Sequence, residues 1–501
     1  MTEHAGPPSP ANTPFADAVL RLRRSADHGE RIVSFHALPW SQGRSLVDSG
    51  RIGEKYRLIF GDEYLASEVA YSGAALDSFF RPTASLEVAQ QLAAEAFGAD
   101  HTFFVTCGTT VANSVAFDAL AEPGKRVLID RMSHQSIHVA AGHSRASVSY
   151  TPCVDAGHPS SQSLLDVSGL IRMIADAYQA DQPFDAVALA AASYDGLLYN
   201  LHWILTACVE ASPGTAFLID EAWAAVNAFH PRLRALTALD AAARIRATGI
   251  ELNLLVTQSA HKSMSAARQG SYLHAIGDSG LIGRVRSALY GRHTTSPSIP
   301  ILASLDLARA HAEIYGERLV QRAIELADKV QRTVREDPQL ADYRASSYAI
   351  HDVEQLLHFS PDPTKVFIDV SGIGLRGDEV KARLFDDYGI YVARTMPGGF
   401  LINLHIGLTE ADVDRLLETL RSLARRERSR SGNAQQLDDQ KLGDPVNHIL
   451  IAYPPGVPLA VPGETWTEQL VERLADSRRC GIDVYALPVS SPAGEPALLL
   501  N

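Results

Sequence analysis

Short apolar runs alternate with helical stretches between about residue 100 and residue 275, and this alternation limits the fold more than any other feature. Strands that alternate with helices imply right-handed crossovers and a mostly parallel sheet that is covered by helices on both faces. The sequence therefore predicts an α/β fold. The runs that have the length and composition of buried strands are residues 101–106, 126–130, 185–192, 217–220 and 252–256.

Lys262 follows the last of these runs, in the sequence TQSAHK at residues 257–262, and is the best candidate nucleophile. Ligands of open α/β sheets bind beyond the carboxyl ends of the strands, so this lysine falls where chemistry is usually done. A lysine in such a place is also commonly a solvated loop cation, because active-site use of an amine needs a desolvated pocket. The residues at the other strand ends help to decide between a reactive lysine and a solvated one.

The first run is followed by the sequence TCGTT at residues 106–110 and then by a helical pattern through Leu120. Gly108 lets the backbone approach an anion, and Thr109 and Thr110 offer N–H and hydroxyl donors. The helix that begins there points its positive end at the same place. A plain strand-to-helix turn capped by threonine would show a similar sequence. The pattern therefore indicates either a phosphate-binding turn or a capped turn.

Two further strand ends supply a histidine and a carboxylate, His134 and Asp220. A lone histidine at a strand end is more often a capping or hydrogen-bonded residue than a catalytic one. Together with the lysine and the threonines, however, these groups meet the needs of pyridoxal 5′-phosphate. That cofactor requires a lysine amine for its aldehyde, a carboxylate that keeps its pyridine nitrogen protonated, a flat side chain against its ring and donors for its phosphate.

Composition excludes several other classes of function. The formal net charge of −13 argues against a surface for nucleic acid or anionic membranes. No signal peptide and no apolar run long enough to cross a bilayer is present, so we expect a cytoplasmic protein. The cysteines lack metal-like or redox spacing, so we expect neither disulfides nor a metal site. They are Cys107, Cys153, Cys208 and Cys480.

The order and spacing of several motifs resemble the major domain of the Orn/Lys/Arg decarboxylase family. The motifs are TCGTTVAN at 106–113, LIDRMSHQS at 128–136, SYDGLLYN at 193–200, DEAW at 220–223 and TQSAHK at 257–262. The resemblance extends from about Gly73 to about Gly407 and resumes at residues 451–464. It implies fold type I of the pyridoxal-phosphate enzymes, in the aspartate aminotransferase superfamily, with a mostly parallel sheet in the large domain and a small α+β C-terminal domain.

Position by position, the resemblance implies a set of cofactor contacts. Lys262 would bond covalently to the cofactor, Asp220 would pair with its pyridinium nitrogen, and His134 would stack on its ring. The phosphate would be held by Gly108, Thr109, Thr110 and Ser259. His261 would contribute phosphate binding or proton transfer.

The resemblance also implies substrate contacts and a partner. Glu464 would receive the distal cation of an amino-acid substrate, and we assign Arg394 to the placement of the substrate carboxylate. Thr295 would reach the phosphate of the neighbouring subunit, so we expect a homodimer with active sites at the subunit interface, or a dimer of dimers. The chain lacks the N-terminal wing domain with which the large decameric members assemble, which argues against large rings.

The expected organisation has five segments. They are an N-terminal arm and helix at 1–70, the large cofactor-binding domain at 71–300, the small α+β domain at 301–424, a polar linker at 425–447 and a short C-terminal substrate-site segment at 448–501. The arm before about Pro14 is rich in proline and polar residues, so we expect it to be flexible.

The expected reaction is decarboxylation of lysine, ornithine or arginine to the corresponding amine and CO2, as in polyamine biosynthesis. Cys107, Val111 and Ala260 depart from the family pattern, and Ala260 removes a hydroxyl beside the reactive lysine. Two alternatives therefore stay open. One is a pyridoxal-phosphate enzyme of another outcome, such as an oxidase, a transaminase or a decarboxylase of a modified amino acid. The other is a non-catalytic, cofactor-binding regulatory protein.

Overall fold

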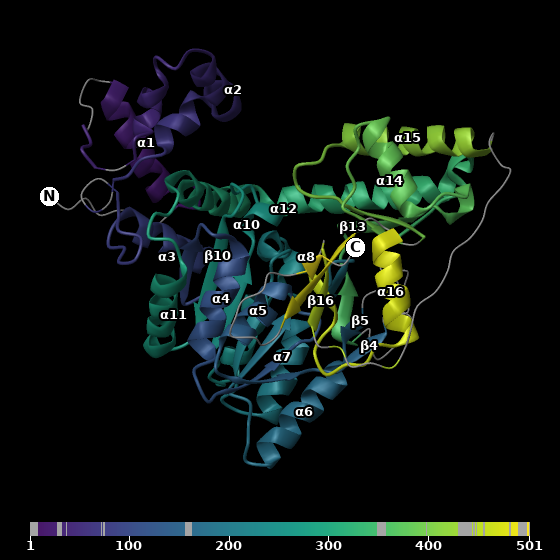
Figure 1. Ribbon diagram of the computed structural model, residues 1–501. Coiled ribbons are helices and arrows are strands. Elements are labelled where there is room, and N and C mark those ends of the chain that lie inside the picture. Colours follow the sequence, from purple (N-terminus) through teal and green to yellow (C-terminus); the bar gives the residue numbers. More distant parts are fainter. Residues whose placement is uncertain are drawn as a thin grey trace. The chain divides into compact units, whose positions relative to one another are not determined.

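The structure is a computed structural model of the chain, whose helices and strands are drawn in Figure 1. The chain divides into two compact units. The first unit consists of Met1–Leu120 and Ala216–Glu317, and the second of Ala121–Thr215 and Arg318–Asn501. The residues described are 9–27, 33–36, 38–71, 73, 76–155, 163–347, 357–396, 398–428, 443, 446, 448–453, 456–479, 482–488 and 498–499. Cys480, residues 1–8 of the expected arm and 429–442 of the expected linker lie outside them. The five predicted segment boundaries stay a prediction.

Four strands of the first unit lie side by side. In spatial order they are β1 (His101–Val105), β10 (Ser271–Ile276), β9 (Leu254–Gln258) and β8 (Ala216–Asp220). β8 and β9 are parallel, whereas β10 runs antiparallel to both of its neighbours. All residues of β8, β9 and β10 are buried, as expected for strands covered on both faces. The predicted run at 252–256 begins and ends too early, because Thr257 and Gln258 belong to β9.

Helices cover these strands. The apolar periodicity from Ser85 to Phe97, followed by Gly98, predicts one of these helices, and the structure confirms it. Its C-terminal residue is followed by Gly98, whose φ of 80° ends the helix with its N–H bonded to Ala94 O. The helices of this unit are α1 (Pro14–Asp27), η1 (Ser41–Leu46), α2 (Gly50–Ser67), α3 (Ser85–Phe97), α4 (Gly108–Leu120), η2 (Ala225–Phe229), α8 (Pro231–Arg234), α9 (Ala238–Ala247), α10 (Ala260–Ser263), α11 (Ser279–Arg292) and the first part of α12 (Ile299–Glu336).

A buried ion pair on α12 fixes the start of α1. Asp306 Oδ2 accepts hydrogen bonds from the backbone N–H groups of Phe15 (2.9 Å) and Ala16 (3.2 Å), and Asp306 Oδ1 lies 3.4 Å from Arg309 Nη2. The Arg309 guanidinium donates to the carbonyl oxygens of Pro10 and Asn12. These bonds connect Pro10 and Asn12 of the expected arm to α12, while the flexibility of the arm stays a prediction.

In the second unit, three parallel strands lie in the order β6 (Ala186–Ala190), β2 (Arg126–Ile129) and β3 (Ser147–Tyr150). Further strands pair as β4 (Cys153–Asp155) with β5 (Ser163–Leu165), and as β7 (Leu197–Tyr199) with β12 (Phe359–Pro361). The helices of this part are α5 (Gln135–His143), α6 (Val167–Gln179) and α7 (Leu201–Ala211).

A second sheet of this unit follows α12. Its strands lie in the order β11 (Arg344–Ser346), β13 (Lys365–Asp369), β15 (Gly399–Asn403) and β14 (Arg394–Met396). The accompanying helices are η3 (Pro338–Leu340), η4 (Ser371–Ile373), α14 (Gly377–Asp386) and α15 (Glu410–Arg428). The sequence predicts a strand at 390–393, but the strand begins at Arg394, where the backbone pairs with Leu401. Leu384, Phe400 and Leu420 share the core of this sheet and its helices.

The C-terminal segment forms a small sheet of its own. Its strands are β17 (Val457–Ala460), β16 (His448–Tyr453), β18 (Asp483–Pro488) and β19 (Leu498–Leu499), in that spatial order. Leu450, Leu470 and Val484 join a separate hydrophobic core with α16 (Glu468–Arg479). The amphipathic pattern from Thr467 to about Leu474 predicts a helix, which α16 confirms, whereas this sheet is not predicted from the sequence.

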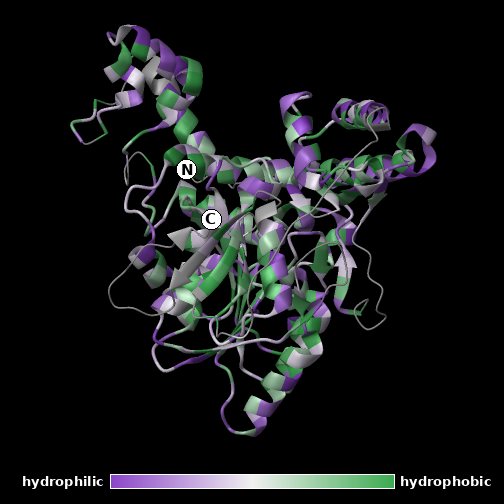
Figure 2. Cartoon of the chain, turned by 45° about the vertical axis from the view of Figure 1, so that its right-hand side comes forward, coloured by the Kyte–Doolittle hydropathy of each residue, from purple (hydrophilic) through white to green (hydrophobic). Residues whose placement is uncertain are grey.

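Hydrophobic residues gather on the strands, whereas many helices show both green and purple residues (Figure 2). Among the described residues, no helix combines the length and the apolarity that crossing a bilayer requires.

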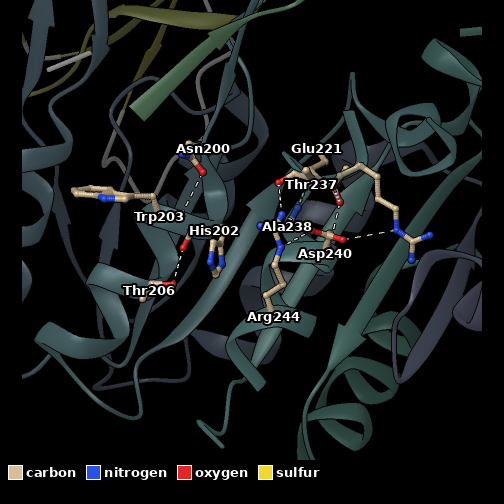
Figure 3. A network of polar contacts seen from close by, with 11 residues as sticks. Asn200, His202, Trp203, Thr206, Glu221, Thr237, Ala238, Asp240 and Arg244 are labelled. Atoms are coloured by element: carbon tan, nitrogen blue, oxygen red, sulfur yellow. Dashed lines mark hydrogen bonds and ion pairs between the residues drawn. The ribbon is translucent and has the colours of Figure 1, made fainter. Parts of the chain in front are cut away.

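A polar network crosses the core of the first unit. Glu221 Oε1 accepts from the backbone N–H of Ala238 (2.5 Å) at the start of α9, as Figure 3 shows, and its Oε2 accepts from Gln258 Nε2 (2.9 Å). Gln258 Oε1 lies 3.0 Å from His274 Nε2, and His274 Nδ1 lies 2.8 Å from Thr102 Oγ1. Burial raises the pKa of Glu221 to about 7 and lowers that of His274 to about 3.

The Asp306–Arg309 pair gives a stability prediction. Asp306→Ala should cost roughly 1–3 kcal/mol of unfolding free energy, because it removes the acceptor of the buried Phe15 and Ala16 N–H groups, while Arg309 keeps Glu313 as a second carboxylate. Asp17→Ala, which removes an exposed acid in the first turn of α1, is the control and should cost about 1 kcal/mol or less. Urea denaturation of both variants measures the difference, and equal losses would contradict the anchoring of α1 by Asp306.

Glu221 gives a pH prediction. Its pKa rises from 4.5 to about 7 on folding, so the folded protein holds this proton more tightly than the unfolded chain. The resulting stability is present below about pH 4.5 and is lost as the pH rises through 7. The stability of Glu221→Gln relative to the native protein should therefore improve by about 3 kcal/mol across that window. Thermal melts at pH 5 and 8 test this, with the exposed Glu95→Gln as control, and parallel pH curves would refute it.

Candidate active site

Three buried hydroxyl groups meet beside the N-terminus of α4 in the first unit. Thr109 Oγ1 lies 2.6 Å from Ser259 Oγ and 2.9 Å from Ser271 Oγ. Gly108 begins the helix with a φ of 77°, and its N–H donates to Gln269 O. Hydroxyl groups can rotate to donate, and the helix end adds a positive potential. This group of residues is therefore suited to an anion.

The Asp220 carboxylate lies at the end of β8 and is held in place by two donors. Asn113 Nδ2 donates to Asp220 Oδ2 (2.9 Å), and the Ala222 N–H donates to Asp220 Oδ1 (2.9 Å). Thr257 Oγ1 donates in turn to Asn113 Oδ1 (2.5 Å). The side chain of Asn113 thus links β9 to Asp220 and orients the carboxylate. A carboxylate oriented in this way can pair with a protonated ring nitrogen.

Lys262 lies on the short helix α10, beyond the end of β9, and is partly buried. Its Nζ lies 4.7 Å from the centre of the Trp223 ring, an arrangement in which an aromatic face attracts an ammonium group. The neighbouring His261 places its Nδ1 2.9 Å from Gly270 O, and since a carbonyl only accepts, the proton of the neutral ring is on Nδ1. Burial lowers the pKa of His261, which leaves Nε2 as the nitrogen able to accept a proton.

His134 belongs to the second unit and is the N-cap of α5. Its Nδ1 accepts a hydrogen bond from the Ser136 N–H (3.2 Å) and lies 2.9 Å from Ser136 Oγ. The capping role that the sequence left open is thus present. It uses one ring nitrogen, so a ring face can still contact a cofactor.

Glu464 also belongs to the second unit and forms an ion pair with Arg131. Arg131 binds both carboxylate oxygens, through Nε to Oε1 and through Nη2 to Oε2 at 2.6 Å. The side chain of Arg131 is 10% exposed and that of Glu464 is 36% exposed. One edge of the carboxylate is therefore fixed, while part of the group stays accessible.

Arg394 is buried in the second unit and pairs with Asp195, with 2.6 Å between Nη1 and Oδ1. Its Nε is buried and, among the described residues, has no hydrogen-bond partner. Lys365 lies on β13, which β15 separates from the strand of Arg394. Its Nζ donates to Tyr194 O (3.0 Å), and burial lowers its pKa. These contacts hold the 193–196 loop, and they leave Arg394 with an unused donor.

The structure brings Gly108, Thr109 and Ser259 together and places Asp220 and Lys262 in the same unit. Thr110 and Thr295 are exposed, so neither belongs to the buried cluster of hydroxyls that Thr109, Ser259 and Ser271 form in this chain. The sequence did not single out five other residues that make contacts with the predicted ones. They are Asn113, Ser271, Trp223, Arg131 and Asp195.

The signal for most of these residues was already present, because Asn113, Arg131, Asp195 and Trp223 lie within the quoted motifs. Ser271 lies outside them and is reached only through the pairing of β10 with β9. The donor set as a whole suits pyridoxal 5′-phosphate: an amine, an oriented carboxylate, and hydroxyls at a helix N-terminus.

Comparisons with known proteins agree with this chemistry. A sequence model of the Orn/Lys/Arg decarboxylase major domain matches residues 14–386. The arginine decarboxylase of Halalkalibacterium halodurans is 30% identical over 467 residues, which cover 87% of this chain and 89% of that protein. The constitutive lysine decarboxylase of Escherichia coli is 28% identical over 424 residues, which cover 77% of this chain and 57% of that protein.

A solved structure of a Francisella novicida lysine decarboxylase superposes with a TM-score of 0.74 at 19% identity, covering 94% of this chain and 77% of that one. This likeness confirms the predicted α/β fold. The family match extends over most of the chain, and the Halalkalibacterium halodurans relative aligns with 87% of it. The chain therefore belongs to the Orn/Lys/Arg decarboxylase family and is an amino-acid decarboxylase that depends on pyridoxal 5′-phosphate.

Proposed function

We propose that this enzyme decarboxylates a basic amino acid and that arginine is its substrate, giving agmatine and CO2. The observation that carries the choice of arginine is the Arg131–Glu464 pair. The similarity to an arginine decarboxylase along 89% of that protein supports the same choice. Lysine and ornithine are the alternative substrates.

Side chains of the first unit would hold the cofactor. Lys262 provides the amine for the aldehyde, and Asp220, oriented by Asn113, keeps the pyridine nitrogen protonated. The phosphate would lie against the hydroxyls of Thr109 and Ser259, near the N-terminus of α4. Gly108 and Ser271 complete this group, Thr110 offers its exposed hydroxyl, and Thr295 would serve the neighbouring subunit.

When bound, the cofactor supplies a ring that takes up the electron pair released as CO2 leaves the substrate. The protein decides which bond breaks by orienting the substrate. We assign the substrate carboxylate to Arg394, whose buried Nε can donate a hydrogen bond. His134 would contact the cofactor ring through a face that the helix cap does not use. His261 can carry a proton on Nε2, because its Nδ1 is already committed to Gly270 O.

We assign the distal cation of the substrate to the accessible part of Glu464. Arg131 already balances the charge of this carboxylate, so an added cation gains less from simple attraction and more from directed hydrogen bonds. A guanidinium group has five donors and is weakly hydrated, whereas an ammonium group is strongly hydrated and costs more to desolvate. This balance favours arginine over lysine and ornithine.

We also propose a homodimer, with a dimer of dimers as the larger alternative. The exposed position of Thr295 would allow its hydroxyl to reach a partner subunit. A cytoplasmic location and a place in polyamine biosynthesis belong to the same proposal.

The reaction can be tested directly. Purified enzyme loaded with pyridoxal 5′-phosphate is incubated with arginine, lysine or ornithine, while CO2 and amine products are followed by mass spectrometry. We expect agmatine and CO2 from arginine, and loss of both in Lys262→Ala, because that variant lacks the amine. Diamine formation would change the substrate to lysine or ornithine, and products that retain the carboxylate would contradict decarboxylation. Full turnover by Lys262→Ala would overturn the role of Lys262.

The role of Glu464 can be tested by Glu464→Gln. The affinity for arginine should fall several-fold or more, since losing a charge-assisted hydrogen bond costs roughly 1.5–3 kcal/mol. The affinity for citrulline, which has the same shape without the charge, should change much less. Glu468→Gln, an exposed acid in the first turn of α16, is the control. Equal losses for arginine and citrulline would point to disruption of the Arg131 pair instead of a lost charge contact.

A further inference from the structure

Gly456 lies directly against the ring of His134. Its φ is 87°, and a Cβ atom added at this position would lie 2.9 Å from His134 Nε2 and 3.2 Å from His134 Cδ2. The first distance is shorter than real Cβ atoms show, and the second is tighter than most real Cβ contacts. Glycine is therefore needed here both for the backbone conformation and for the space that the imidazole occupies.

The backbone of Gly456 is hydrogen-bonded both to β16 and to the start of α5. Its N–H donates to Ala452 O (2.8 Å) at the end of β16, and its carbonyl accepts from the N–H of Gln135 (2.8 Å), the first residue of α5. The residue next to His134 is thus bonded to the same glycine that lies against the ring. Small shifts of the C-terminal segment would therefore reach the histidine directly.

Arg131, three residues before His134, also contacts the C-terminal segment. Arg131 binds the carboxylate of Glu464, and its Nη2 also donates to Leu459 O (3.1 Å). Residues 131–135 are thus bonded to residues 456–464 at two positions, Arg131 and Gln135. The contacts of Arg131 fix the position of residues 131–135, and those of Gly456 fix the place of the His134 ring.

We propose that Gly456 is a positioning residue that sets the orientation of the His134 ring toward the cofactor. This inference rests on the proposed contact between His134 and the cofactor ring. The Ser136 N–H and hydroxyl fix Nδ1 from one side, and Gly456 closes the space at Nε2 and Cδ2 from the other. The C-terminal segment, through Gly456, thereby controls how the cofactor is held, apart from any role of Glu464 in substrate binding.

The test compares two glycines of the same segment in the cofactor-loaded enzyme. Gly456→Ala should displace the His134 ring, change the visible circular dichroism of the bound cofactor, and weaken cofactor binding roughly two- to tenfold, the range expected for loss of a ring contact. Gly463→Ala is the matched control, because Gly463 also has a positive φ (94°) but no atom within 4 Å of its added Cβ. Equal effects of the two variants would overturn the proposal.

A double-mutant cycle shows whether the effect passes through the histidine. In the His134→Ala background, Gly456→Ala should cause no further change in the spectrum or in the cofactor dissociation constant. A full effect in that background would also overturn the proposal. Should Gly456→Ala alone fail to fold, the double variant should regain folding, because the space of the ring is then open, and failure of that rescue would count against the contact.

The readout separates this proposal from the proposed reaction. An enzyme that binds the cofactor but releases no CO2 from any basic amino acid still gives the dichroism signal, so the cycle can be completed. A His134→Ala variant with an unchanged spectrum would remove the cofactor contact of His134, and with it the positioning role of Gly456.

Discussion

Burial of β8 and β9 along their whole length is the constraint on which the first unit depends. With all ten of their residues buried, the polar groups at the carboxyl ends of these strands must find partners inside the protein, because an unpaired buried group costs roughly 1–3 kcal/mol. Asp220 lies opposite Thr257 in the pairing of the two strands, and Asn113 bonds to both of their side chains. The candidate cofactor carboxylate is thus oriented by the same contacts that satisfy the strand ends.

Alternation along the strands sends the next pair of residues to the opposite face. Glu221 and Gln258 bond to each other and continue through His274 into the core. Neighbouring carboxylates therefore have different surroundings: Asp220 accepts a hydrogen bond from Asn113, whereas burial raises the pKa of Glu221. A sequence containing Asp-Glu offers two acids, and the geometry of the strand decides which of them can serve a cofactor.

The sequence predicts the elements of this fold where local pattern decides them. The apolar runs of β2, β6 and β8, the helix α3 ended by Gly98, and the glycine turn before α4 all appear near the expected positions. Contacts made across long stretches of chain are not predictable in this way. Asn113 meets Asp220 across 107 residues, Ser271 meets Thr109 across 162, and Arg131 meets Glu464 across 333.

The same distinction explains the errors in the second unit. The strand predicted at 390–393 is displaced to Arg394 because backbone pairing with β15, and not the local β-branched pattern, fixes where it begins. The small C-terminal sheet escaped prediction because β16 pairs with β17 on one side and with β18 on the other, and the second pairing joins Tyr453 to Asp483 across α16. Pairings of that kind become visible only once the chain is folded.

The two interpretations of His134, a helix cap or a cofactor contact, are compatible because they use different parts of one ring. Capping of α5 needs only a lone pair on Nδ1, whereas stacking needs a face of the ring. Fixing Nδ1 also limits rotation of the imidazole, so the cap would pre-orient the face that meets the cofactor, in the way that supporting hydrogen bonds fix functional groups elsewhere. A structural role at this position is therefore a condition for the proposed functional one and not an argument against it.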